Sequence, residues 1–310
     1  MKRVLIIGAG VIAKEYLKVI KMRKGIVVSC IFSRTYSKTL SLSKKFKIKK
    51  IFKTKNELAK NKDLFDAIIV AVNIENNLKI LKFCLTLNKK ILIEKPLALN
   101  FKQNKDLNKL DKYSKKNIFV AMNRRFFDSS LYLKRKLTKF SNQKRIVEVY
   151  DCQNERYFDK KKFHPQVRKS LMYANSIHLI DYFNMFCRGK ISKVFITKKN
   201  FGEINFLNAI IKFSSNDIGY YYCDLNFFSK WKVRVGLKKE IWTFSPLESV
   251  QYNNFNSNKK KLLTFKTNFK DGFLNQIDHF KNLLNRKKND LVSFDSYFKT
   301  ISIIHKIYGK

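Results

Sequence analysis

The chain has 310 residues, and its 66 Lys and Arg against 23 Asp and Glu give a formal net charge of +43. A hydrophobic content of 45% can fill the cores of two domains, and no apolar run approaches the roughly 18 residues of a membrane span. The five cysteines are scattered and never in CxxC spacing. This excludes a zinc cluster or disulfide framework, predicts no metal site, and indicates a reduced, cytoplasmic compartment.

The positive charge by itself suggests an acidic partner such as nucleic acid, an anionic membrane surface or a phosphorylated substrate. Only 12 of the basic residues are arginine, the side chain that groove-reading proteins favour, and the lysines are spread from end to end. We therefore interpret the charge as compositional drift and expect neither a nucleic-acid nor a membrane partner. Such a field would still attract an anionic substrate.

The first element that we expect is a buried strand over residues 4–7, VLII, because its apolar residues do not alternate. Gly8 would allow a tight turn, Gly10 would let the backbone approach a pyrophosphate, and Ala13 fits the third position of a GxGxxA fingerprint. A helix over residues 11–24 would direct its first amides at that phosphate. The cofactor-binding candidates here are Gly8, Gly10, Val11 and Ile12.

Two other interpretations of this stretch compete with a nucleotide site. A signal peptide is disfavoured because the apolar run ends in Lys14 and Glu15 without a small-residue cleavage site. A plain strand-to-helix turn of another α/β fold stays open on the glycines alone.

A second strand is expected over residues 26–32, which completes a βαβ unit. Ser33, Arg34 and Thr35 follow it, where an acidic residue would hold the ribose of NAD. Hydroxyls and a guanidinium suit a 2′-phosphate instead, so we predict NADP in preference to NAD.

Strands and helices continue to alternate up to about residue 121, which predicts a doubly wound parallel sheet with ligands at the carboxyl ends of its strands. The further expected strands are residues 50–52, 67–72, 91–93 and 118–121, and the expected helices are residues 37–46, 56–60, 76–87 and 101–116. Ala71 and Asn73 lie at the end of one such strand and are further cofactor-binding candidates.

Glu94, Lys95 and Pro96 follow directly on the strand at residues 91–93. A GxGxxA turn, a later strand that ends in EKP, and an antiparallel second half resemble the glucose-fructose oxidoreductase, inositol dehydrogenase and MocA family. The resemblance implies that Lys95 faces both nicotinamide and substrate, with a cis peptide before Pro96. A lysine partly desolvated in a crevice has a lowered pKa and can exchange a proton near neutral pH.

The loop after residues 67–72 departs from that family, which usually has a proline and then a histidine where this chain has residues 73–77, NIENN. After the sixth strand come Asn123, Arg124 and Arg125, where the family places polar residues near cofactor and substrate. We take Asn123 and Arg125 as substrate-binding candidates, while an interdomain salt bridge is an equally open role for either arginine.

Beyond residue 129, β runs follow one another without intervening helices, which predicts an antiparallel sheet. The expected strands are residues 145–155, 194–197, 205–213, 218–227, 231–237, 241–244 and 262–265, and the expected helices are residues 129–140, 173–187, 272–286 and 293–308. We therefore expect a dinucleotide domain over residues 1–123 and an α+β domain over residues 124–310, whose last helix packs back on the first domain. One sheet face would meet a second subunit of a homo-oligomer, a dimer or tetramer.

His178 and Asp181 match the family pattern Asp-x-x-x-His-x-x-Asp, whereas Ala174 replaces its leading acid. The resemblance implies that this helix faces the substrate. The lost acid moves more of the acid/base role onto Lys95 and leaves His178 to orient or polarise the substrate oxygen. Tyr173 and Asn175 are near enough to donate hydrogen bonds in place of the lost acid. Asp181 is expected to orient or cap.

The sequence thus predicts an NAD(P)-dependent oxidoreductase that acts on CH–OH groups of a sugar, inositol or nucleotide sugar, in surface-polysaccharide precursor biosynthesis. The altered loop and Ala174 leave open a catalytically silent dinucleotide-binding regulator or scaffold. The charge leaves open a polyanion-binding protein on an old dinucleotide scaffold.

Overall fold

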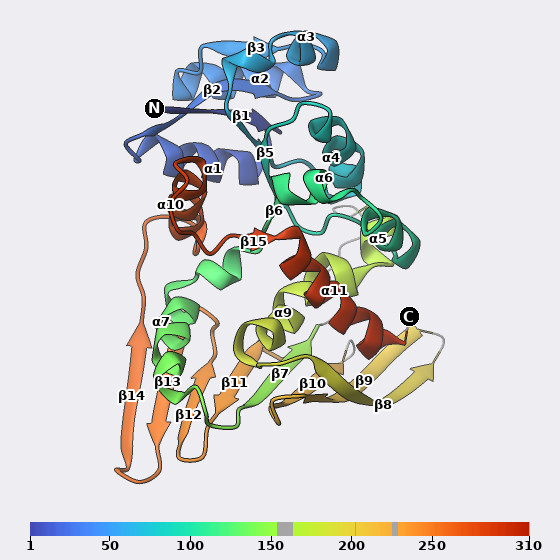
Figure 1. The fold of residues 1–310 in the computed structure, drawn as a ribbon, viewed down its shortest axis with the longest axis vertical. Helices are drawn as coiled ribbons and strands as arrows, with labels where there is room; N and C mark the ends of the chain where they lie inside the picture. The colour runs from blue at the N-terminus through green and yellow to red at the C-terminus, as the bar shows by residue number, and fades with distance from the viewer. Residues whose placement is uncertain (154–163, 202, 225–228, 310) are drawn as a thin grey trace. The chain divides into compact units, whose positions relative to one another are not determined.

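The computed structural model describes residues 1–153, 164–201, 203–224 and 229–309 (Figure 1). The chain forms two compact units: the first comprises Met1–Phe126 and Thr267–Phe298, and the second comprises Phe127–Lys266 and Lys299–Lys310. The domain boundary expected after residue 123 stays a prediction.

The first unit is built on a sheet in the order β15-β6-β5-β4-β1-β2-β3, in which β15 alone among the described strands runs antiparallel to its neighbour. Its strands are β1 (Lys2–Ile7), β2 (Ile26–Phe32), β3 (Lys50–Phe52), β4 (Ala67–Val70), β5 (Lys90–Glu94), β6 (Ile118–Ala121) and β15 (Val292–Ser293). Every residue of β4 is buried, and so are the last four of β1. Such strands need no alternation because helices cover both sheet faces. The predicted parallel, doubly wound sheet is confirmed.

The helices of the first unit alternate with its strands, and a late helix joins them. They are α1 (Val11–Lys21), α2 (Tyr36–Phe46), α3 (Lys55–Lys60), α4 (Asn77–Leu85), α5 (Phe101–Leu107), α6 (Lys112–Asn117), α10 (Phe273–Leu284) and the start of α11 (Phe294–Tyr308). Helix α10 lies alongside α1, where Arg23 and Asp278 form an ion pair at 2.9 Å (Figure 1). The chain thus returns, more than 250 residues later, to support its first helix.

One predicted helix is wrong, because residues 101–116 form α5 and α6 with a break between them. The side chain of Asp111 accepts a hydrogen bond from the backbone N–H of Ser114 at 2.9 Å and so caps a new helix start. An Asp in the N-cap position satisfies an amide that would otherwise lack a partner, which favours a second helix over a continuous one.

The second unit carries a sheet in the order β14-β13-β12-β11-β7-β10-β9-β8, as far as the chain is described. Its strands are β7 (Ile146–Cys152), β8 (Ile191–Phe201), β9 (Glu203–Phe213), β10 (Ile218–Asp224), β11 (Lys232–Gly236), β12 (Glu240–Phe244), β13 (Ser249–Asn254) and β14 (Lys259–Thr264). Neighbours run antiparallel except β7 and β10, which are parallel. The predicted, mostly antiparallel sheet is confirmed, while its predicted residues 154–155 and 225–227 lie outside the described residues.

Helical segments between residues 128 and 186 accompany this second sheet, and the last of them packs on β7 and β11. They are α7 (Asp128–Leu137), α8 (Pro165–Arg168), a π-helical turn (Met172–Ser176) and α9 (Ile177–Phe186). A Cβ at Gly219 of β10 would lie 2.8 Å from the ring of Phe183, so the glycine lets α9 pack directly on the sheet.

Strand β13 was not predicted, because its sequence SVQYNN lacks a clear apolar alternation.

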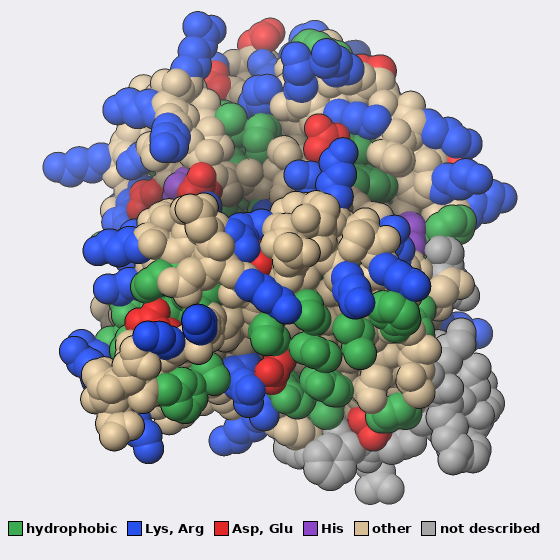
Figure 2. All heavy atoms as spheres, turned by 60° about the horizontal axis from the view of Figure 1, so that its bottom comes forward, with side chains coloured by type: hydrophobic (Ala, Val, Ile, Leu, Met, Phe, Trp, Pro, Cys, Tyr) green, Lys and Arg blue, Asp and Glu red, His purple; other side chains and the backbone are tan. Residues whose placement is uncertain are grey.

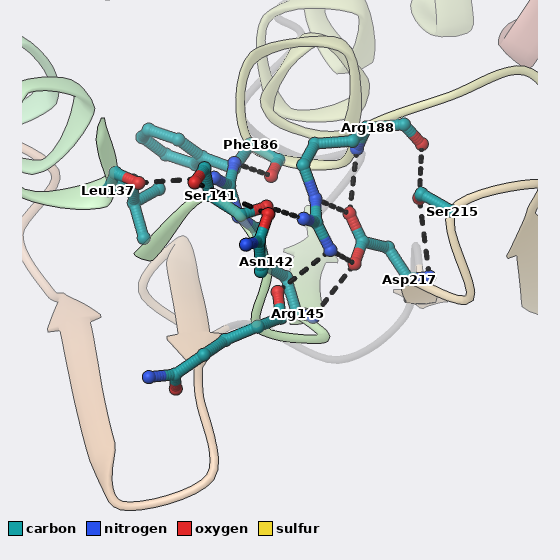
Figure 3. Close-up of polar contacts among 9 residues, drawn as sticks. Leu137, Ser141, Asn142, Arg145, Phe186, Arg188, Ser215 and Asp217 are labelled. Carbon is teal, nitrogen blue, oxygen red and sulfur yellow. Dashed lines mark hydrogen bonds and ion pairs between the residues drawn. The ribbon is translucent and has the colours of Figure 1, made fainter. Parts of the chain in front are cut away.

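A buried ion cluster joins the helices of this unit to its strands (Figure 3). The carboxylate of Asp217, fully buried before β10, accepts two hydrogen bonds from the Arg188 guanidinium and one from the backbone N–H of Arg145. Arg145 in turn donates to the carbonyl of Phe186 at 2.9 Å and so satisfies the end of α9.

Candidate active site

The turn between β1 and α1 can only be built around glycine. Gly8 has φ +126°, and a Cβ there would lie 2.1 Å from the carbonyl oxygen of Ala71. The space beside Gly10 is open, and α1 begins there without a side-chain cap. Its first backbone amides are therefore available to an anion, as the fingerprint predicted.

A cavity of about 360 Å³ opens beside this turn at the carboxyl ends of β1, β2 and β4. Among the predicted cofactor-binding residues, its lining includes Gly8, Gly10, Ser33, Arg34, Thr35, Ala71 and Asn73. Val11, which is 75% exposed, and Ile12 follow in the first turn of α1. The cavity thus unites residues from three separate stretches of sequence.

Three lysines that sequence reasoning did not single out also line this cavity. They are Lys38, Lys55 and Lys79. Together with Arg34 they give the cavity a cationic rim, and no acidic side chain is among its described lining residues. A cradle of this kind fits the phosphates of a dinucleotide. In a chain so rich in lysine, only the fold could separate these three from the rest.

Lys95 lies at the carboxyl end of β5, the strand next to β4, and is half-buried. Its peptide bond to Pro96 is cis, as the family resemblance implied. Burial lowers the pKa of Lys95 to about 7, the positive charge of Arg124 acts in the same direction, and the negative charge of Glu94 opposes both. An amine with this pKa exists in both protonation states near neutral pH.

The backbone around Lys95 is held by Asn77, at the start of α4. Its side-chain amide donates to the carbonyl of Glu94 at 2.9 Å and to that of Pro96 at 2.8 Å. Asn77 belongs to the stretch where the sequence departs from the family pattern, and it is fully buried. The altered loop therefore still supports the Glu-Lys-Pro turn.

Glu94 is held from its other side by Tyr16, whose hydroxyl donates to the carboxylate at 2.6 Å. Burial raises the pKa of Glu94 above its ordinary value, and the hydrogen bond from Tyr16 and the charge of Lys95 only partly offset this. Sequence reasoning missed Tyr16 and Asn77, because no motif connects them to the Glu-Lys-Pro turn.

The polar residues after β6 have distinct surroundings. Asn123 donates to the carbonyl of Asp271 at 3.2 Å, and Arg125 donates to the hydroxyl of Ser296 at 2.9 Å. Arg124, which the sequence analysis did not prefer, is the arginine whose charge acts on Lys95. All of these residues belong to the first unit.

The remaining candidates lie together in the second unit, on the π-helical turn and the start of α9. His178 is 8% exposed, and Tyr173 is 2% exposed with its ring edge-on to His305. Burial raises the pKa of Tyr173 to about 12, which keeps its hydroxyl protonated. Asn175 donates to the side-chain oxygen of Gln153 at 2.7 Å. A π-helical turn is often found at functional sites.

Asp181 lies one turn after His178 and accepts a hydrogen bond from the hydroxyl of Thr300 at 2.5 Å. Asp181 is 2% exposed, and this bond joins α9 to the part of α11 that belongs to the second unit. The role expected of Asp181, to cap the helix or to orient His178, stays a prediction.

Within the described residues, no helix combines the length and the apolar content needed to cross a membrane. No group of three or more His, Cys, Asp or Glu side chains in the described part of the chain is placed to hold a metal ion.

A glycine turn, a cationic cavity at the carboxyl ends of parallel strands and a helix N-terminus define a dinucleotide-binding Rossmann protein. In agreement, residues 2–122 match the family described as "Oxidoreductase family, NAD-binding Rossmann fold". Over these residues the chain is similar to the Gfo/Idh/MocA family of NAD-binding oxidoreductases. The predicted resemblance to this family is confirmed over residues 2–122, and the family is one of oxidoreductases.

Solved structures share the whole fold at low identity. A dehydrogenase from Chromobacterium violaceum superposes with a TM-score of 0.83 at 13% identity, over 100% of this chain and 95% of that one. A Gfo/Idh/MocA family oxidoreductase from Vibrio cholerae has a TM-score of 0.78 at 14% identity, over 99% of this chain and 97% of that one. UDP-N-acetylglucosamine 3-dehydrogenase from Acidithiobacillus ferrooxidans has a TM-score of 0.77 at 11% identity, over 99% of this chain and 96% of that one. No curated protein matches the chain.

Proposed function

We propose that this protein transfers a hydride between a nicotinamide cofactor and a carbon of a sugar or nucleotide sugar. The observation that carries the proposal is the half-buried Lys95, with its lowered pKa, at the same sheet edge as the dinucleotide cavity. The cavity's cationic lining and the Gly8 turn, which a Cβ would fill, fit a bound dinucleotide. When bound, the cofactor supplies or accepts the hydride.

Each candidate residue has a role in this proposal. Lys95 exchanges the proton of the substrate hydroxyl, and His178 donates a hydrogen bond to the substrate oxygen. Asn123, Arg125, Tyr173 and Asn175 position the substrate. Because Ala174 cannot move a proton, the acid/base work rests on Lys95.

We further propose NADP as the preferred cofactor, because Arg34 and Lys38 line the cavity beside β2 where an acidic residue would favour NAD. Replacing Arg34 with Ala should weaken NADPH binding about 10- to 100-fold, the loss of one charge-assisted hydrogen bond to a 2′-phosphate. NADH binding should change little. The rise of the thermal unfolding midpoint with the concentration of each nucleotide measures both affinities.

The matched control for this prediction is Lys62→Ala, which removes an exposed cation outside the cavity. It should leave both affinities unchanged. If Arg34→Ala weakens NADH as much as NADPH, the guanidinium does not distinguish the two cofactors.

The substrate class rests on the family resemblance and on the neighbour whose name specifies a UDP-sugar. We propose surface-polysaccharide precursors as the pathway and the cytoplasm as the location, where the five cysteines, all free thiols here, would stay reduced. Incubation with NADP⁺ or NAD⁺ and a panel that includes UDP-N-acetylglucosamine and myo-inositol tests this through absorbance of the reduced cofactor. Cofactor binding without turnover of any panel member would favour the silent alternative, which Ala174 motivates.

We also propose that the protein is a homo-oligomer that associates through the uncovered face of the second sheet. Apolar side chains gather on this unit in the lower half of Figure 2. Ile210, Phe195 and Ile146 are 37–41% exposed, and Ile210 pairs across strands with both Phe195 and Tyr220. The neighbouring side chains of Glu148 and Arg234 form an ion pair at 3.0 Å, so their charges cancel. An exposed apolar face of this kind suits a second copy of the same chain.

Replacing Ile210 with Lys should convert the oligomer to monomer, because it places a charge in the middle of the proposed interface. Light scattering coupled to size-exclusion chromatography measures the mass. Leu262→Lys, at the exposed and distant strand β14, is the control and should keep the wild-type mass. A wild-type chain that elutes as a monomer at micromolar concentration would refute the proposal.

A further inference from the structure

Behind Glu94 lies a buried polar pair from two helices that are far apart in sequence. The Tyr16 hydroxyl, from α1, donates to the Glu94 carboxylate at 2.6 Å, and the side-chain amide of Gln276, from α10, donates to the Tyr16 oxygen at 2.8 Å. Tyr16 and Gln276 are both fully buried. The Tyr16 ring also packs against Phe273, with ring centroids 4.8 Å apart.

The chemistry of the donors fixes the direction of this chain of hydrogen bonds. The Nε2 atom of Gln276 can only donate, so the Tyr16 oxygen accepts there and directs its own proton to Glu94. Burial, together with the charge of Glu94, raises the pKa of Tyr16 well above its ordinary value, so the phenol keeps that proton. A neutral donor aimed at a carboxylate stabilises its ionised form.

The ionised form of Glu94 matters because two cations, Arg124 and Lys270, act on Lys95 in the opposite direction. Arg124, on the turn Asn123–Phe126, and Lys270, just before α10, both disfavour a charged Lys95, whereas Glu94 favours it. Tyr16 is itself titratable but stays neutral. The protonation of Lys95 therefore depends on how firmly the carboxylate of Glu94 is kept charged.

We propose that Tyr16 and Gln276 are positioning residues that hold Glu94 ionised and in place next to Lys95. This proposal rests on the proposed function in so far as Lys95 is the acid/base group. Tyr16 lies on α1, whose N-cap residue Gly10 lines the dinucleotide cavity, so the same helix serves the cofactor at one end and the acid/base pair further along.

The test is Tyr16→Phe, which removes the hydroxyl and keeps the ring. Glu94 should then become protonated more easily, and the midpoint at which Lys95 loses its proton should fall by about half a unit to one unit. Competitive acylation of the intact protein across pH, read for the Lys95 peptide by mass spectrometry, reports that midpoint without any substrate. Gln276→Leu leaves Tyr16 without its donor and should shift the midpoint in the same direction by less.

Three further variants separate positioning from stability. Phe273→Leu removes packing from the Tyr16 ring and should lower the thermal midpoint without moving the Lys95 titration. Glu94→Gln should shift the titration downward, and adding Tyr16→Phe to it should shift it no further, because the hydroxyl acts through the carboxylate. A further shift in the double variant, or an unchanged midpoint in Tyr16→Phe, overturns the proposal.

The labelling assay also keeps this proposal distinguishable from the proposed function. If Lys95 titrates as expected in every variant but no panel substrate is turned over, the positioning role stands and the oxidoreductase proposal fails. If turnover depends on Lys95 while its midpoint ignores Tyr16, the function stands and the positioning role fails.

Discussion

Lys95→Met is expected to lower kcat for hydride transfer by about 10²–10⁴-fold, the range that a positioned general acid or base contributes. Methionine retains a long side chain of similar volume but cannot exchange a proton. The affinity for NADPH should stay within about twofold, because Lys95 does not line the dinucleotide cavity among the described residues. Steady-state kinetics and a thermal-shift titration measure the two quantities.

The pH dependence of the wild-type enzyme should follow from the same amine. Alcohol oxidation needs the neutral form of Lys95, so kcat should rise as the pH passes upward through about 7. Carbonyl reduction needs the protonated form, so its kcat should fall over the same interval. Lys95→Met should lose both limbs of this profile.

Lys90→Met is the matched control, because Lys90 lies at the other end of the same strand and donates to the carbonyl of Lys116. It should keep both the rate and the pH profile. Full turnover in Lys95→Met would remove the lysine from the mechanism while leaving the fold intact.

Sequence reasoning predicted the first unit well because its information is local. Apolar runs such as residues 67–70 are buried on both faces, and the spacing of Gly8 and Gly10 reports a turn that a Cβ would block. The break between α5 and α6 was missed because it depends on one side chain, Asp111, that caps a new helix inside a continuous helical pattern.

The site was only partly predictable because its supports come from distant segments. Gln276 reaches Tyr16 across 260 residues, and no spacing rule relates them. Asn77 was visible only as part of a loop that differs from the family pattern, yet it holds the carbonyls on both sides of Lys95. Motifs report the groups that do chemistry, whereas the groups that hold them are decided by which helices pack together.

Asp217→Ala is expected to lower the free energy of unfolding of the second unit by about 3–5 kcal/mol, the cost of removing one partner of a buried ion pair. The Asp217 side chain is fully buried, and its carboxylate accepts hydrogen bonds from Arg188 and from the backbone N–H groups of Arg145 and Arg188 (Figure 3). Without it, these donors lose their acceptor in a buried place. Both tryptophans, Trp231 and Trp242, belong to this unit, so their fluorescence in a urea titration follows its unfolding.

The sign of the pH dependence gives this prediction a second test. Burial pushes the pKa of Asp217 up, but the hydrogen bonds from Arg188 and from the backbone outweigh it and hold the pKa below its ordinary value. A carboxyl group whose pKa is lower in the folded state stabilises that state at pH values above its unfolded-state pKa of about 3.9. This stabilisation is lost as the pH falls through the folded-state pKa. The difference in free energy of unfolding between wild type and Asp217→Ala should therefore become smaller below about pH 4. Asp106→Asn breaks an exposed pair with Lys109 in the first unit, and it should change the tryptophan transition of the second unit by less than about 0.5 kcal/mol at any pH. An equal loss in both variants would show that the buried cluster adds nothing beyond a surface pair.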